Sequence, residues 1–84
     1  MISANFTLND TTPVKILDSQ NFEQHIYVHN EVAGAIYVGG SDVTATSGFH
    51  LGNHESVEIR VPQDNELYGI TGSGAGTVIV LRPN

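Results

Sequence analysis

Four histidines are the residues of this chain best suited to bind a metal ion or transfer a proton near neutral pH. His25 and His29 lie four positions apart in a segment rich in aromatic and β-branched residues, which favours a strand. On a strand this spacing separates them by about 13 Å. Ligand nitrogens lie only about 2.0–2.1 Å from a zinc ion. We therefore expect that these two histidines cannot share an ion unless the strand bends.

The other two histidines, His50 and His54, flank Leu51-Gly52-Asn53, a predicted loop that could bring them together. The metal site of cupins, which a small β-barrel would suggest, requires His-x-His on one strand and a downstream glutamate, and this pattern is absent. We therefore predict no metal site and no cofactor, and we interpret the histidines as surface residues.

The motifs of nucleophilic catalysis and of phosphate binding are also absent. Ser41-Asp42 follows two glycines, but no G-x-S-x-G elbow is present. Gly39-Gly40-Ser41 could form an anion-binding nest. A Walker loop would also require Gly-Lys-Ser/Thr, and the single lysine, Lys15, lies far upstream. We predict no catalytic residues and expect that the chain is not an enzyme.

The stretch Gly39-Gly40-Ser41-Asp42 is instead typical of a corner between two strands. We expect a positive φ at one or both glycines, because glycine adopts it without a steric penalty. We expect Asp42 to accept backbone N–H groups as a turn residue. After a second turn at Ser47-Gly48, Phe49 and Leu51 are predicted to return to the core.

Short segments of alternating hydrophobicity predict the elements that must position these side chains. Between residues 55 and 61, Val57, Ile59 and Val61 point one way while Glu58 and Arg60 point the other. No window shows helical periodicity over three turns. We predict an all-β fold without substantial helix, a small antiparallel, jelly-roll-like β-sandwich of about seven or eight short strands. The expected strands include residues 6–8, 14–17, 25–31, 36–38, 55–61, 67–71 and 77–82.

Length and charge limit the classes of protein that remain. Residues 1–84 are expected to form one domain, with residues 1–12 either its first strand or an N-terminal arm. The formal net charge of -6 argues against binding to nucleic acid or to an anionic membrane. We recognise no signal peptide and no apolar run long enough to span a membrane.

The last predicted strand carries the main sign of self-association. Val78-Ile79-Val80-Leu81 is apolar on both faces, whereas a solvated face would show a polar residue at every second position. The strand is therefore buried between two sheets, or its outer face is covered by another subunit. Both readings fit the sequence equally well.

The segment Ile36-Tyr37-Val38-Gly39-Gly40-Ser41-Asp42-Val43-Thr44 resembles a motif of small β-sandwich structural proteins of tailed bacteriophages. Gly48-Phe49-His50-Leu51, Glu55-Ser56-Val57, Glu66-Leu67-Tyr68-Gly69-Ile70 and Thr77-Val78-Ile79-Val80-Leu81 follow it in the same order as in that family. The resemblance covers about residues 11–82. It breaks at Gly52-Asn53-His54, where the family has a plainer turn.

The resemblance implies a virion structural protein without catalytic residues. The leading hypothesis is a capsid decoration (cement) protein that binds the outer surface of the head as a homotrimer and stabilises the major capsid protein lattice. It would occupy the host cytoplasm only during assembly. The predicted interface residues are Phe6, Leu8, Tyr27, Tyr37, Ile79 and Leu81. The alternatives are a host-glycan-binding module associated with a tail or head fibre, and a head-completion or connector protein.

Overall fold

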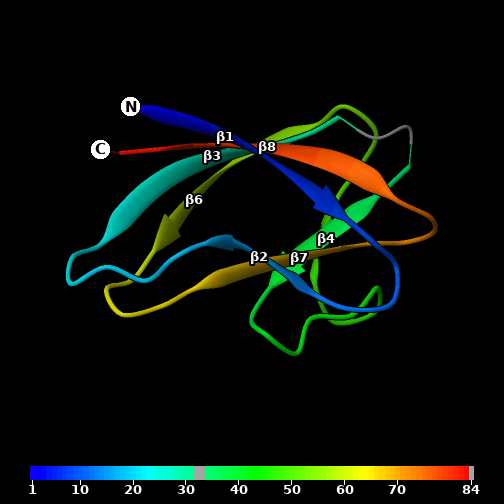
Figure 1. The fold of residues 1–84 in the computed structure, drawn as a ribbon, viewed down its shortest axis with the longest axis horizontal. Coiled ribbons are helices and arrows are strands. Elements are labelled where there is room, and N and C mark those ends of the chain that lie inside the picture. Colours follow the sequence, from blue (N-terminus) through cyan, green and yellow to red (C-terminus); the bar gives the residue numbers. More distant parts are fainter. Residues whose placement is uncertain (32–33, 84) are drawn as a thin grey trace.

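The computed structural model describes residues 1–31 and 34–83 and consists of two antiparallel sheets packed face to face (Figure 1). The first sheet has the strand order β1-β8-β3-β6 and the second has the order β2-β7-β4-β5. The described residues contain no helix that could cross a membrane. The predicted all-β sandwich is confirmed. Its strands are β1 (Ile2–Leu8), β2 (Val14–Leu17), β3 (Gln24–Asn30), β4 (Ile36–Gly39), β5 (Phe49–Leu51), β6 (Ser56–Val61), β7 (Leu67–Thr71) and β8 (Gly76–Arg82).

The strand pairing is that of a long two-stranded ribbon rolled up on itself. β1 pairs with β8, β2 with β7, β3 with β6, and β4 with β5, all antiparallel. The roll is closed by β3 pairing with β8 and β4 pairing with β7. This is the jelly-roll arrangement of eight strands. It leaves β1 and β6 at the edges of the first sheet, and β2 and β5 at the edges of the second.

Strand β3 shows how the alternating sequence builds the core. Its inward row is Gln24, Ile26, Val28 and Asn30, all buried, while the residues between them face outward. Ile26 pairs with Ile59 of β6, and Val28 pairs with both Val57 of β6 and Val80 of β8. The buried core consists of Leu8, Ile16, Leu17, Ile26, Val28, Ile36, Val38, Leu51, Val61, Leu67, Val78 and Val80.

Residues 2–8 form an ordinary first strand. β1 pairs with β8 along its whole length, from Ile2 opposite Arg82 to Leu8 opposite Gly76. Leu8 is fully buried in the core. Its assignment to an interface between subunits is therefore wrong, because its side chain fills the space between the sheets and reaches no outer surface.

The expected positive φ at Gly39 or Gly40 is also wrong. Val43 N donates to Gly40 O at 3.0 Å, which makes Gly40 the first residue of the turn and Ser41 and Asp42 its central residues. The first position of a turn needs no positive φ. Among the described residues, positive φ occurs at His54, Asp64 and Gly74.

Phe49 does not return to the core as predicted, although Leu51 does. Leu51 is buried, whereas Phe49 is 59 % exposed. Both residues belong to β5, an edge strand, and point to the same side of it. Leu51 belongs to the buried core cluster, while Phe49 lines an open groove between β5 and β6.

Gly48 is the glycine of this corner that the packing requires. A Cβ at position 48 would lie 2.6 Å from Val43 Cγ2 and 2.7 Å from Tyr37 Cβ, whereas a Cβ at position 40 would meet only Asp42 Oδ1, at 3.3 Å. We predict that Gly48→Ala lowers the free energy of unfolding by about 1–3 kcal/mol. The matched variant Gly40→Ala should change it by less than about 0.5 kcal/mol. Urea unfolding measures both, and equal stability of the two variants would refute this account of the corner.

Candidate functional site

The C-terminal end of β3 is held in place by hydrogen bonds of Asn30, the last residue of the strand. This residue is fully buried. The two hydrogens of its Nδ2 are shared among three carbonyl oxygens, Gly34 O at 2.8 Å, Leu51 O at 3.1 Å and Gly52 O at 2.8 Å. Its backbone N donates to Glu55 O at 2.9 Å. Asn30 therefore joins β3 to the end of β5 and to both ends of the turn formed by residues 52–55.

That turn holds His54 in a defined backbone conformation. Glu55 N donates to Gly52 O at 3.1 Å, and Gly52 N donates to Glu55 Oε1 at 2.6 Å. His54 has a φ of 56°. This left-handed conformation is uncommon for residues other than glycine, although histidine adopts it more often than most. The turn brings His54 up to the end of β3.

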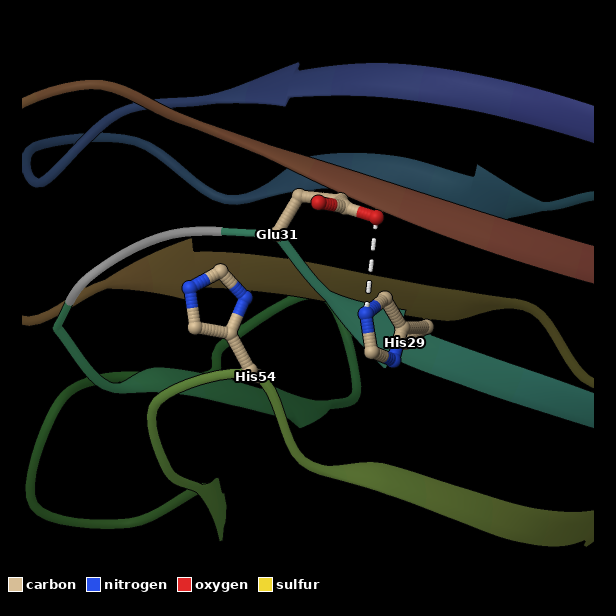
Figure 2. Close-up of side chains that lie close together, drawn as sticks. All are labelled: His29, Glu31 and His54. Carbon is tan, nitrogen blue, oxygen red and sulfur yellow. Dashed lines mark ion pairs between the residues drawn. The ribbon is translucent and has the colours of Figure 1, made fainter.

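His29, Glu31 and His54 form a cluster at this end of the sandwich (Figure 2). One potential ligand atom from each residue lies within 4.8 Å of the other two. His29 Nε2 is 3.4 Å from Glu31 Oε1. The imidazole rings of His29 and His54 have centroids 6.5 Å apart. Two imidazoles and a carboxylate are a donor set that can hold a divalent transition-metal ion.

Sequence reasoning missed this cluster because it compared histidines that are near neighbours in the chain. The cluster takes one histidine from each of the two pairs that were considered. It depends on the β3–β6 register, in which His29 lies opposite Ser56. His25 instead contacts Glu58 through Nε2, and the ring of His50 packs against Tyr37. The sequence signal for this cluster would have been an outward-facing histidine on one strand, His29, together with a histidine just before the strand that pairs with it, His54.

Three of the predicted interface residues lie together on the outer face of the first sheet. Tyr27 is directly opposite Leu81, and the next outward residues, His29 and Ile79, are also paired. Tyr27 is 44 % exposed, while Ile79 and Leu81 are half-buried. We call Tyr27, Ile79 and Leu81 the outer apolar patch. Its neighbours on the flanking strands, such as Asn5 opposite Ile79, are polar.

The hydroxyl group of Tyr27 is tied to the neighbouring edge strand. Tyr27 pairs with Glu58 of β6. A hydrogen bond to the Glu58 carboxylate, and then its negative charge, raise the pKa of Tyr27 above its usual value. The ring of Tyr27 also stacks on His25, with centroids 6.0 Å apart. Tyr27 is therefore an exposed aromatic ring with two polar neighbours, His25 and Glu58, that hold it in place.

The remaining predicted interface residues lie elsewhere. Phe6 borders a groove of about 210 Å³ between the edge strands β1 and β2, beside Lys15 and Asp18. Tyr37 lies on the second sheet, where its ring meets His50 edge-on at a centroid distance of 5.4 Å. The six residues therefore do not make one surface, although Tyr27, Ile79 and Leu81 do.

The opposite open side of the sandwich holds an apolar groove. It has a volume of about 310 Å³ and lies between the edge strands β5 and β6. Five apolar side chains and Glu58 line it. The apolar residues are Val38, Phe49, Val57, Ile59 and Leu67. Val57 and Ile59, predicted to share one face of their strand, pack against the core but remain partly exposed here.

Comparison with known proteins gives no relative from which a function could be transferred. No protein-family model, no curated protein and no solved structure matches this chain. Two features stand out: the outer apolar patch, which can bind another protein surface, and the cluster, which can hold a metal ion.

The role of Asn30 can be tested by a substitution that keeps its shape. Asn30→Asp replaces an NH₂ donor that faces three carbonyl oxygens with an oxygen atom. We predict a loss of at least about 2–3 kcal/mol in the free energy of unfolding. Asn53→Asp, an exposed residue in the adjoining turn, makes the same chemical change and is the matched control. Comparable stability of the two variants in chemical denaturation would show that Asn30 does not anchor this end.

Proposed function

We propose that this chain is a structural protein of a tailed-bacteriophage virion, and specifically a capsid decoration protein. In this proposal it binds the outer surface of the head as a homotrimer and stabilises the lattice of the major capsid protein. The observation that carries the proposal is the motif Ile36-Tyr37-Val38-Gly39-Gly40-Ser41-Asp42-Val43-Thr44, with the ordered matches that follow it. The outer apolar patch supplies a physical reason for assembly.

The outer apolar patch has the layout expected of a protein-binding surface. Apolar side chains at its centre are bordered by polar ones, as in the core and rim of a typical interface. Isolation from water would favour contact of this face with another protein, because burial of apolar area contributes about 25 cal/mol per Å². A copy of the same chain and the capsid shell are the partners that the proposal assigns to it.

The charge of the chain supports a position outside the packaged genome. A formal net charge of -6 repels the phosphate backbone of DNA. On a capsid surface such a protein would contact only protein. The sandwich itself suits a clamp, because the two central strands of each sheet, β8 and β3 in the first and β7 and β4 in the second, are hydrogen-bonded on both sides.

Light scattering after size-exclusion chromatography tests the self-association. We predict a trimer for the natural chain and a folded monomer for Leu81→Glu, which places a charge in the outer apolar patch. Phe49→Glu is the matched control, since Phe49 is an exposed apolar residue that borders the groove instead. It should remain trimeric.

Three outcomes would count against this assignment. A monomeric natural chain at high concentration would remove the trimer. Dissociation caused by Phe49→Glu but not by Leu81→Glu would move the contact to the groove. A larger ring would favour the head-completion or connector alternative. Far-UV circular dichroism of each variant establishes that it is folded.

A second candidate function is binding of host glycans by a fibre-associated module. It is favoured by Tyr27, an exposed aromatic ring bordered by His25 and Glu58. Flat aromatic faces with polar groups beside them suit the apolar faces and hydroxyl groups of sugars. We predict that any binding on a glycan array is lost in Tyr27→Ala and kept in Tyr37→Ala, whose ring is half-buried against His50. The absence of binding by the natural chain would eliminate this candidate.

A further inference from the structure

We propose that His29, Glu31 and His54 bind a divalent transition-metal ion of the Zn²⁺ type, and that the ion fastens the turn of residues 52–55 to the end of β3. The inference is independent of the proposed role in a virion. It replaces the expectation, drawn from chain neighbours alone, that the histidines are only surface residues.

The separations of the ligand atoms are close to those of a zinc site. Bonds of about 2.0–2.1 Å in a tetrahedral site place ligand atoms roughly 3.3–3.4 Å apart. His29 Nε2 and Glu31 Oε1 already lie 3.4 Å apart. The largest separation in the cluster is within 4.8 Å. A ligand atom therefore has to move by at most about 1.5 Å to reach tetrahedral separations.

His29 is held in an orientation that suits metal binding. Its Nδ1 lies 2.6 Å from Ser56 Oγ. When Nδ1–H donates to this hydroxyl oxygen, Nε2 keeps its lone pair and directs it toward Glu31 and His54 (Figure 2). Metal-binding histidines usually donate their second ring N–H in this way, which fixes both tautomer and ring orientation.

The other two ligands are carried by backbone that is fixed by hydrogen bonds. Glu31 N donates to Thr77 O at 3.1 Å. His54 lies in the turn closed by Glu55 N and Gly52 O, which the side chain of Asn30 holds against β3. The three side chains therefore converge from two strand ends whose relative position is set without the ion.

The donor set selects among cations. Two imidazoles and one carboxylate suit Zn²⁺, Co²⁺ or Ni²⁺, whereas Mg²⁺ and Ca²⁺ prefer oxygen ligands throughout. Among residues 1–31 and 34–83 the cluster has three such ligands, which leaves a fourth position for water. His29 and Glu31 are 34 % and 42 % exposed at their side chains, so the site is open to ions from solvent.

The chain contains a natural comparison for this site. His25 contacts Glu58 through Nε2 on the same face of the same sheet. The described residues offer no third ligand there, since His29, Glu31 and His54 form the one group among them in which three His, Cys, Asp or Glu side chains bring ligand atoms within 4.8 Å of one another. A single histidine with a carboxylate should bind a metal ion far more weakly than the cluster does.

Isothermal titration calorimetry with ZnCl₂ tests the proposal on the full chain. We expect one ion per chain, an affinity at least about tenfold lower for His54→Asn, and no change for His25→Asn. Asparagine is chosen at position 54 because it tolerates the left-handed conformation, so the variant keeps its turn. An excess of MgCl₂ should not displace the zinc.

Further variants separate a built site from general attraction of cations to an acidic chain. Ser56→Ala should lower the affinity about tenfold while the stoichiometry stays the same. Bound Co²⁺ should show the intense visible absorption of a tetrahedral site. The proposal is overturned if the natural chain binds no zinc, if His25→Asn weakens binding as much as His54→Asn, or if Mg²⁺ competes.

Discussion

The hydrogen bonds of the Asn30 side chain are the constraint on which the end of the sandwich with the His29–Glu31–His54 cluster depends. The inward row of β3 has an apolar middle, Ile26 and Val28, and an amide at each end. At the other end Gln24 Nε2 donates to Asp18 O at 2.9 Å. Ile26 and Val28 pack in the core between the two sheets. The side-chain amides of Gln24 and Asn30 hydrogen-bond to backbone carbonyl oxygens of neighbouring segments. Without the Asn30 amide, the buried Leu51 carbonyl oxygen would lose its donor, at a cost of about 1–3 kcal/mol for a buried group left unpaired.

The fold was predictable from the sequence because the inside-outside alternation of a strand is local. In residues 55–61 the alternation of apolar and polar side chains by itself predicts which side faces the core, and the burial of side chains along β6 follows this pattern. The errors arose where the answer depends on distant parts of the chain. The sequence alone did not show whether Leu8 is buried or on the surface, because this depends on the pairing of β1 with β8. The expected positive φ at the glycine pair failed because the turn begins at Gly40 instead of being centred on it.

The site was less predictable than the fold for the same reason. His29 and His54 are 25 positions apart in the sequence, and only the β3–β6 register brings them together. The outer apolar patch was partly predictable, since the apolar residues on both faces of β8 indicate that its outward face is apolar as well as its inward face. The sequence did not predict which tyrosine belongs to this patch. Tyr27 and Tyr37 both lie in short apolar segments, and only the strand pairing shows that they belong to different sheets.

The two sheets differ in what they offer to a partner. On the second sheet, Val43 folds back and is buried near Gly39, Gly48 and Tyr37. On the first sheet, Tyr27 remains exposed beside Leu81, and Ile79 pairs with His29 of the His29–Glu31–His54 cluster. The outer apolar patch and the cluster therefore adjoin on one face, which is the contact face under the proposed function.

An electron-microscopy map of the kind of phage particle to which the proposed function assigns this chain tests the proposed contact face most directly. The account predicts sandwich density in threefold sets on the outside of the head, with Tyr27 and Leu81 turned toward neighbouring protein. Particles that lack the chain, or density in which Tyr27 and Leu81 face solvent, would contradict it.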